Sequence, residues 1–265
     1  MASIEWLISE NCNFNCKYCA LWDNNKQPET DLTKIKSFLI KIKTLQQKLN
    51  LEFFIFGGEP LLHPKIEKII SILDTFNIDY RFQTNLSDYA TNTLLKLKSA
   101  GYIFKKLNIS VHLSQQSVNE YIENISKLLE NNININTIEV MFYGKEMIND
   151  YKILQNKFDN VVLAPVSDFL VEGFGDILKQ YNQLRIDDTS IKFEELKMVH
   201  PINQNLIYRS FIWQEFIDKI WSPKGKLCLL KDKFFMFDSQ LNTFNCCFHD
   251  FITDEICTYD TCFLS

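Results

Sequence analysis

The sequence predicts an α/β fold in which parallel strands alternate with helices and build a partial or full β/α barrel. Short apolar segments alternate with segments of helical spacing from the first residues to Val166. Strands joined by crossover helices pair in parallel, and the crossovers are right-handed. No feature of the sequence signals a reversal of strand order, which favours a barrel over a doubly wound sheet.

The predicted elements follow one another in a regular order. Apolar runs predict six strands, at Ile4–Ser9, Leu51–Phe56, Ile78–Thr84, Leu107–Leu113, Ile135–Phe142 and Val161–Val166. Apolar side chains at helical spacing predict five helices, at Asp31–Leu49, Pro64–Phe76, Tyr89–Ala100, Ser114–Glu130 and Lys145–Phe158. In such a fold the ligand site lies beyond the carboxyl ends of the strands.

The regular alternation weakens after Val166. Helical segments are predicted at Asp168–Leu184 and Phe211–Trp221. Phe234–Asp238 and Leu241–Cys247 flank a short turn, which predicts a β-hairpin. We therefore expect three parts: a barrel over 1–185, a helical connection over 186–225 and a small C-terminal domain over 226–265.

The composition is that of an ordinary globular protein. Of the 265 residues, 46% are hydrophobic and 23% are charged, which excludes disordered and fibrous chains. The net charge of −5 argues against a protein that coats nucleic acid. No apolar run reaches the roughly 18 residues of a membrane span, and no secretory signal is visible. We expect a cytoplasmic protein with no nucleic-acid or membrane partner, whose thiols stay reduced.

The eight cysteines gather towards the two ends of the chain. A chain that used cysteine as a small core residue would spread it out. In a reducing compartment, clustered thiols indicate metal ligands or catalysts rather than disulfides. Two metal sites are therefore expected, from Cys12, Cys16, Cys19, Cys228, Cys246, Cys247, Cys257 and Cys262.

The first cluster lies on the loop that follows the first predicted strand. Cys12, Cys16 and Cys19 can hold three irons of a [4Fe–4S] cluster and leave the fourth iron open. An open iron can bind and activate a ligand. A zinc loop and free core thiols are the alternatives, and zinc would need a fourth ligand. The nearest histidine in the sequence is His63.

This cysteine spacing resembles the radical SAM superfamily, and the resemblance spans about Ile4–Val166. The segment after the second strand matches the glycine-glycine-glutamate-proline motif of that family, with Gly57, Gly58, Glu59 and Pro60. Two further segments resemble the ends of the third and fourth strands of the family, at Arg81–Asn85 and Asn108–His112. His112 lies within an apolar strand and is interpreted as a core histidine rather than a base.

The resemblance implies a partial (β/α)6 barrel and a [4Fe–4S] cluster on Cys12, Cys16 and Cys19 that binds S-adenosylmethionine (SAM). The reduced cluster would cleave SAM to methionine and a 5′-deoxyadenosyl radical, which abstracts a substrate hydrogen. A reducing electron donor such as flavodoxin or ferredoxin is implied. The residues implied to contact SAM are Tyr18, Gly57, Gly58, Glu59, Pro60, Thr84, Asn85 and Ser110.

Several of these residues have a specific expected role. The glycines would let the backbone approach the methionine moiety of SAM closely. Glu59 would accept a hydrogen bond from its amino group. Tyr18 would pack near the adenine or shield the cluster.

The C-terminal cysteines resemble the ligands of a twitch domain, the shortened relative of the SPASM domain. A hairpin brings its ends together, so Cys228 and Cys246 can face one site, and Cys257 and Cys262 follow. Four thiolates suffice for an auxiliary [4Fe–4S] cluster with no open iron. Cys246 is favoured over Cys247, because adjacent strand residues point to opposite faces. A zinc knuckle is the alternative.

The expected reaction is a radical SAM oxidation, or dehydrogenation, of a small polar or sugar-like substrate, with the auxiliary cluster accepting the electron. The sequence shows no peptide-recognition domain before Cys12, which favours a small molecule over a peptide. A peptide- or protein-modifying maturase is the alternative. The alternative from another class is a non-catalytic iron–sulfur electron carrier or redox sensor. Such a protein would not need Gly57–Pro60 after the second strand.

Overall fold

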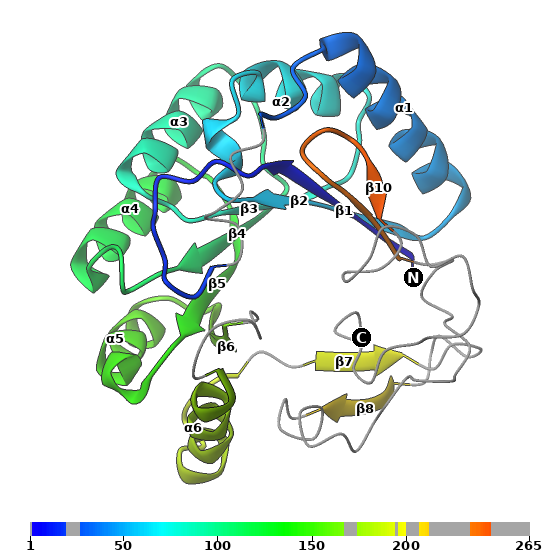
Figure 1. Ribbon diagram of the computed structural model, residues 1–265. Coiled ribbons are helices and arrows are strands. Elements are labelled where there is room, and N and C mark those ends of the chain that lie inside the picture. Colours follow the sequence, from blue (N-terminus) through cyan, green and yellow to red (C-terminus); the bar gives the residue numbers. More distant parts are fainter. Residues whose placement is uncertain are drawn as a thin grey trace.

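The computed structural model describes residues 2–19, 27–166, 174–193, 196–199, 207–211 and 234–244. Its centre is a curved eight-stranded sheet with the order β10-β9-β1-β2-β3-β4-β5-β6 (Figure 1). Seven of these strands run parallel, and β10 runs antiparallel to β9. The sheet does not close, so the predicted partial barrel is confirmed.

Each strand and helix predicted as far as Val166 is present. The strands of the large sheet are β1 (Ala2–Ser9), β2 (Leu51–Gly57), β3 (Arg81–Thr84), β4 (Lys106–Val111), β5 (Ile135–Phe142), β6 (Val161–Pro165), β9 (Phe234–Phe237) and β10 (Thr243–Phe244). The helices are α1 (Leu32–Lys48), α2 (Ile66–Thr75), α3 (Asp88–Ser99), α4 (Val118–Glu130), α5 (Ile148–Lys157) and α6 (Phe174–Asp187). Two short 3₁₀ turns precede α2 and α5, namely η1 (Pro60–Leu62) and η2 (Lys145–Met147).

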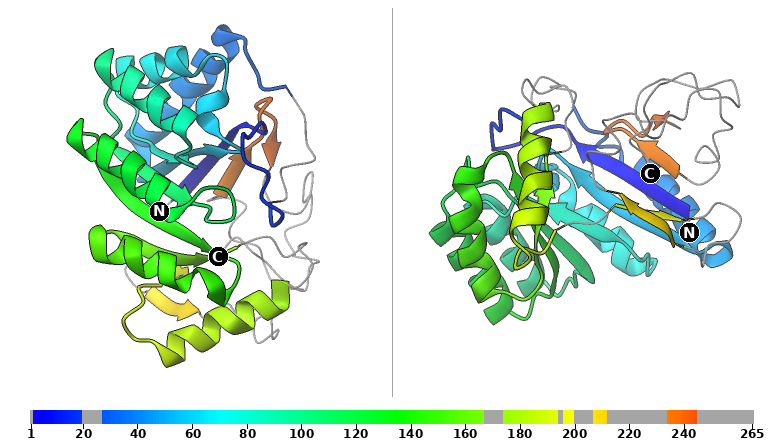
Figure 2. Two further views of the ribbon diagram at one scale, coloured as in Figure 1. Left: turned by 90° about the vertical axis from the view of Figure 1, so that its left-hand side faces the viewer. Right: turned by 90° about the horizontal axis from the view of Figure 1, so that it is seen from below.

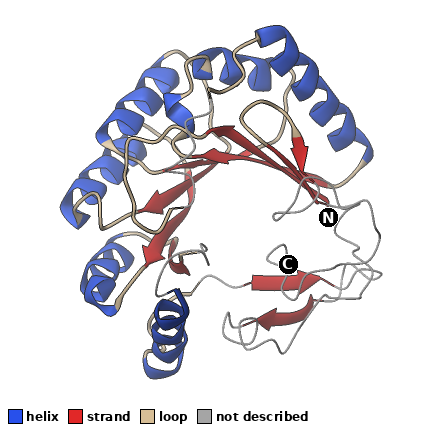
Figure 3. Cartoon of the chain, viewed as in Figure 1, coloured by secondary structure: helices blue, strands red, loops and turns tan. Residues whose placement is uncertain are grey.

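Helices α1 to α5 lie on the convex side of the curved sheet (Figures 1 and 3). The side chains between the sheet and these helices form the hydrophobic core. Trp6 is fully buried there, and its ring lies 5.2 Å from the ring of Phe38 on α1. Because side chains alternate along a strand, the residues between the core positions face the concave side.

Capping side chains decide where several helices begin. Helix α4 starts at Val118 rather than at the predicted Ser114, because Ser117 and Glu120 form a capping box. Asp31 caps α1 by accepting a hydrogen bond from the backbone N–H of Thr33. Ser87 caps α3 in the same way.

None of the helices in the described ranges is long and apolar enough to cross a membrane.

The predicted C-terminal hairpin is present in its described part, and it joins the barrel sheet. Strand β9 pairs in parallel with β1, in a register that sets Ser3 opposite Phe234 and Trp6 opposite Phe237. Figure 2 shows the hairpin beside β1, at the edge of the sheet. The described part of 226–265 therefore continues the barrel, whereas the division into three parts remains a prediction.

Two strands were not predicted from the sequence. Strands β7 (Leu196–Val199) and β8 (Ile207–Phe211) form a separate antiparallel sheet of two strands. Strand β8 ends at Phe211, the residue at which the sequence pattern predicts that a helix begins. The rest of that predicted helix lies outside the described residues, as does the first part of the helix predicted at Asp168–Leu184.

Candidate functional site

The three N-terminal cysteines lie on the loop that follows the carboxyl end of β1. As whole residues, Cys16 is buried, Cys19 is partly buried and Cys12 is exposed. A turn holds the second and third cysteines together, because the backbone N–H of Cys19 donates to the carbonyl of Cys16 at 3.0 Å. The loop therefore presents the three thiols from one short segment at the expected edge of the sheet.

Burial and neighbouring charges raise the pKa values of two of the three thiols. Burial, with a smaller contribution from the charges of Cys12 and Cys19, raises the pKa of Cys16 to about 12. Burial also raises the pKa of Cys12, and the charges of Glu59 and Cys19 add to the effect. These thiols keep their protons near neutral pH unless a metal replaces them, which couples metal binding to proton release.

The donor set fits a cluster with one open iron better than it fits a single ion. In the ranges that the structure describes, no group of three or more His, Cys, Asp or Glu side chains converges as the ligands of one ion. A [4Fe–4S] cluster bonds each thiolate to a different iron, so its ligands lie farther apart than those of a single ion.

His63 is not available as the fourth ligand of a zinc site. Its Nδ1 accepts a hydrogen bond from the backbone N–H of Lys65 at 3.1 Å. Its Nε2 donates to the carbonyl oxygen of Glu29 at 3.1 Å. The side chain is 2% exposed, and burial lowers its pKa to about 4. Both ring nitrogens are thus occupied in the neutral form, which argues against the zinc alternative at the first cluster.

The glycine pair after β2 packs directly on the start of the cysteine loop. The backbone N–H of Gly58 donates to the carbonyl of Ser9, and that of Glu59 to the carbonyl of Asn11, both at 2.8 Å. A Cβ on Gly58 would lie 2.5 Å from the carbonyl oxygen of Asn11, and one on Gly57 would meet the carbonyl oxygen of Ser9. The glycines are therefore required by the chain's own backbone. Whether they also approach SAM remains a prediction.

Glu59 joins the ends of β2 and β3 from a fully buried position. Its carboxylate accepts from the backbone N–H of Asn85 at 2.7 Å, from that of Leu61 at 3.0 Å and from the hydroxyl of Thr84. Burial raises the pKa of Glu59 to about 7, against the opposing effect of these hydrogen bonds. Pro60 follows as the buried first residue of η1. The contact of Glu59 with SAM remains a prediction.

The loop after β3 holds the first half of the cysteine loop. The side-chain amide of Asn85 donates to Asn13 Oδ1 at 2.9 Å and to the sulfur of Cys12 at 3.6 Å. Asn13 in turn donates to the hydroxyl of Ser87 at 2.7 Å. Thr84 and Asn85 thus lie beside the cysteines, as the sequence predicts. Asn13 was not predicted, although it lies between two cysteines of the motif.

The loop after β4 holds the second half of the cysteine loop. The hydroxyl of Tyr18 hydrogen-bonds to His112 Nδ1 at 3.0 Å, and its ring stacks on that of Tyr143 at 5.5 Å. Burial lowers the pKa of His112 to about 4, so its ring is neutral and satisfied by Tyr18. The side chain of Gln115 binds the backbone N–H and carbonyl of Asn15 at 3.0 and 3.2 Å. No feature of the sequence pointed to Gln115.

Ser110 belongs to a polar group on the concave face of the sheet. The side-chain amide of Gln83 on β3 contacts Ser110 on β4 and donates to Glu139 on β5 at 3.0 Å. Asn108 donates to the other carboxylate oxygen of Glu139 at 3.2 Å. Three neighbouring strands therefore supply hydrogen-bonding side chains to the concave face. The remaining predicted ligands, Cys228, Cys246, Cys257 and Cys262, lie outside the described residues.

Comparison with known proteins gives one family. The family model of the Radical SAM superfamily matches residues 6–155. A relative named S-adenosylmethionine-dependent nucleotide dehydratase, from Fibrobacter sp. (strain UWH6), is 25% identical, over 75% of this chain and 75% of that protein. Radical SAM cyclopropyl synthase TigE from Paramaledivibacter caminithermalis is 23% identical, over 82% of this chain and 45% of that protein.

Solved structures share the fold. Streptococcus suis SuiB bound to S-adenosylmethionine superposes with a TM-score of 0.60, covering 97% of this chain at 15% identity. The chain spans 63% of the length of SuiB and less than half of the cyclopropyl synthase. The likeness to SuiB therefore supports the architecture. The three cysteines and the glycine motif lie within residues 6–155, the segment that the family model matches.

Proposed function

Because the chain belongs to the radical SAM superfamily, we propose that it is an enzyme that removes a hydrogen atom from a small polar or sugar-like substrate and oxidises it. The observation that carries this proposal is the loop of Cys12, Cys16 and Cys19, tied to the glycine motif by two backbone hydrogen bonds. When bound, a [4Fe–4S] cluster with SAM on its open iron supplies a 5′-deoxyadenosyl radical, which takes the hydrogen atom.

The chain's own residues hold the thiols in place. Gly58 and Glu59 fix the start of the cysteine loop, Asn85 binds it near Cys12, and Gln115 binds it at Asn15. Tyr18 hydrogen-bonds to Cys16, and its ring stacks on that of Tyr143. This arrangement positions three thiolates before any substrate binds, which is the contribution that a protein makes to cofactor chemistry.

A polar substrate is supported by the concave face of the sheet. Gln83, Ser110 and Glu139 offer amide, hydroxyl and carboxylate groups there, which can hydrogen-bond to substrate hydroxyls. The relative from Fibrobacter is named as acting on a nucleotide, and a nucleotide contains a sugar. These two observations favour a sugar-like substrate, nucleotides included. A peptide substrate remains the alternative, because the fold is shared with SuiB bound to precursor peptide SuiA.

The oxidation requires an acceptor for the electron that the substrate radical gives up. We assign this role to an auxiliary [4Fe–4S] cluster on Cys228, Cys246, Cys257 and Cys262, on the strength of their number and spacing. The hydrogen atom leaves with the radical that abstracts it, and the substrate then loses one proton and this electron. An electron donor such as flavodoxin or ferredoxin would reduce the first cluster.

The test replaces Cys12, Cys16 and Cys19 together by alanine in reconstituted protein. We expect the loss of about four irons, one cubane cluster, and no 5′-deoxyadenosine after reduction with dithionite in the presence of SAM. The matched control is Cys247→Ala, at the cysteine left unassigned at the C-terminal site. This variant should retain the iron and the formation of 5′-deoxyadenosine.

Two outcomes would contradict the proposal. SAM cleavage by the triple variant would show that these thiols do not hold the cluster. An unchanged protein that holds iron but never forms 5′-deoxyadenosine would instead be an electron carrier or redox sensor.

A further inference from the structure

The turn of the β9–β10 hairpin contacts both stems of the cysteine loop. We define the near stem as residues 9–11, before Cys12, and the far stem as residues 27–31, after Cys19. The hydroxyl of Ser239 donates to Glu10 Oε1 at 3.2 Å, and the carbonyl of Ser239 accepts from the backbone N–H of Glu29 at 2.7 Å. One residue, far away in the sequence, therefore binds the chain on both sides of the cysteines.

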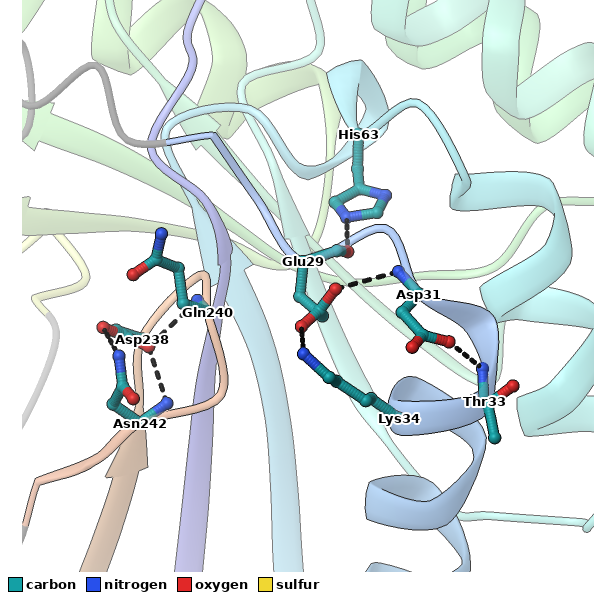
Figure 4. Close-up of polar contacts among 8 residues, drawn as sticks. All are labelled: Glu29, Asp31, Thr33, Lys34, His63, Asp238, Gln240 and Asn242. Carbon is teal, nitrogen blue, oxygen red and sulfur yellow. Dashed lines mark hydrogen bonds and ion pairs between the residues drawn. The ribbon is translucent and has the colours of Figure 1, made fainter.

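Ser239 is held rigidly by its own turn. Asp238 Oδ1 accepts from the backbone N–H groups of Gln240 and Asn242, at 2.9 and 2.7 Å. Asp238 Oδ2 accepts from the side-chain amide of Asn242 at 2.9 Å, as Figure 4 shows. Ser239 itself is fully buried. The turn thus presents its hydroxyl and carbonyl in one fixed orientation.

The far stem is fixed around Glu29 (Figure 4). Its carbonyl accepts from His63 Nε2, and its carboxylate accepts from the backbone N–H of Asp31 at 2.9 Å and from Lys34 Nζ at 3.0 Å. His63 directly follows η1, so the far stem is tied to the glycine motif as well. Both stems are therefore anchored on one side by the segment after β2 and on the other by Ser239.

Within the near stem, the side chain of Glu10 depends on Ser239. The side chain of Glu10 is 6% exposed, and its Oε2 has no hydrogen-bond partner among the described residues. A buried carboxylate that loses a donor is costly, because the full desolvation of the group is then uncompensated. Removing the hydroxyl of Ser239 should therefore displace Glu10, which lies two residues before Cys12.

We propose that Ser239 is a positioning residue for the cysteine loop: through its bonds to Glu10 and Glu29, the C-terminal hairpin sets the geometry in which the three thiols hold their cluster. This inference rests on the proposed function, since it takes Cys12, Cys16 and Cys19 as the cluster ligands. Ser239 does not touch the substrate or the cofactor in this role, and it acts only through the two stems.

The first test measures the loop in the protein before iron is added. In Ser239→Ala, amide hydrogen exchange over residues 11–19 should be about tenfold faster than in the unchanged protein, because the near stem has lost one of its two anchors. Ser239→Thr keeps the hydroxyl and should restore the slow exchange. Gln240→Ala, an exposed neighbour on the same turn, is the matched control and should leave exchange unchanged.

The second test uses the reconstituted enzyme. Ser239→Ala should raise the KM for SAM about tenfold, equivalent to about 1.4 kcal/mol, with a smaller effect on kcat. It should also change the electron paramagnetic resonance spectrum of the reduced cluster, and Ser239→Thr should reverse both effects.

The inference is overturned if Ser239→Ala leaves exchange over 11–19 and the KM for SAM unchanged. It is also overturned if exchange rises equally throughout the protein, because the serine would then only stabilise the fold. Failure of the proposed function has a different signature. The unchanged protein would not cleave SAM, while the exchange measurement before iron loading would remain readable.

Discussion

Two single residues near the cysteine loop are fixed by their surroundings: Gly58 has no space for a side chain, and His63 cannot take up a second ring proton. Gly58 lies against two backbone carbonyls of the near stem, those of Glu10 and Asn11. His63 uses both ring nitrogens in hydrogen bonds that only its neutral form can make. Each residue can therefore be tested by a small change with a specific physical consequence.

Gly58→Ala should lower both the stability and the iron content. The new Cβ would lie 2.5 Å from the carbonyl oxygen of Asn11, so the near stem must move, at a cost of about 2 kcal/mol. Urea unfolding and iron analysis of reconstituted protein measure the two effects. Gly101→Ala is the control. Its positive φ makes alanine unfavourable by about 1 kcal/mol, but no neighbour lies within 4 Å. Iron binding should survive there, and equal iron loss in both variants would contradict the explanation.

His63 should make stability depend on pH. Burial lowers its pKa from 6.5 to about 4 in the folded protein, so the unfolded chain binds more protons between these values. Its stabilising contribution is complete above pH 6.5 and is lost as the pH falls towards 4. The penalty of His63→Gln should therefore be larger at pH 7 than at pH 4.5, by up to about 3 kcal/mol at 1.4 kcal/mol per pKa unit. Urea unfolding checks this, with the exposed Ser99→Ala as a pH-independent control. An equal penalty at both pH values would contradict it.

At the scale of elements, the hairpin is attached to the barrel by side-chain packing as well as by backbone pairing. The ring of Phe237 on β9 lies 4.7 Å from that of Phe38 on α1, which also packs on Trp6 of β1. The hairpin therefore contacts the helix that begins directly after the far stem. Loss of this contact should loosen the edge of the sheet without touching any cysteine.

Phe237→Ala should destabilise the protein by about 2 kcal/mol, less than a fully buried phenylalanine because the ring is partly exposed. The midpoint of urea unfolding measures this. Tyr89→Ala, on α3, is the matched aromatic control, because Tyr89 is 53% exposed and should tolerate truncation. Similar losses in the two variants would show that the hairpin does not pack on α1 in solution.

Local patterns predicted most elements, and contacts distant in sequence account for what was missed. The strands and helices from Ile4 to Val166 each have their own periodicity, so each could be recognised alone. Strands β7 and β8 lie after Val166, where the regular alternation of strands and helices weakens, and the apolar run from Phe211 resembles a helix. The cysteines and Gly57–Pro60 form compact motifs and were predicted. Ser239 and Gln115 reach the site only through the fold, so no pattern in the sequence indicated them.

At the scale of the whole molecule, an open sheet carries a polar group on its concave face and a cysteine loop at the carboxyl ends of its strands. Glu139, Ser110 and Gln83 lie on three neighbouring strands, whereas the loop follows β1. Under the proposed function, the polar group would bind the substrate and the cysteine loop would hold the cluster.

The proposed second cluster determines the metal content of the whole molecule. Reconstituted protein should hold about eight irons, four per cubane cluster. Replacing Cys228 and Cys246 together by alanine should leave about four irons, with SAM cleavage retained and substrate oxidation lost. Iron and zinc analysis with Mössbauer spectroscopy measures this. About four irons and one zinc in the unchanged protein would instead identify a structural zinc knuckle, and the oxidation would lack its electron acceptor.

The parallel pairing of β9 with β1 also constrains the order in which the chain can fold during synthesis. The first strand receives one neighbour early, from β2, but its other edge stays unpaired until Phe234–Phe237 has been made. An unpaired edge can pair with another chain, and contacts between distant residues form slowly. The cysteine loop likewise gains its bond to Ser239 only at this late stage. A nascent chain would therefore expose three thiols on an incompletely anchored loop, and productive iron loading would follow synthesis rather than accompany it.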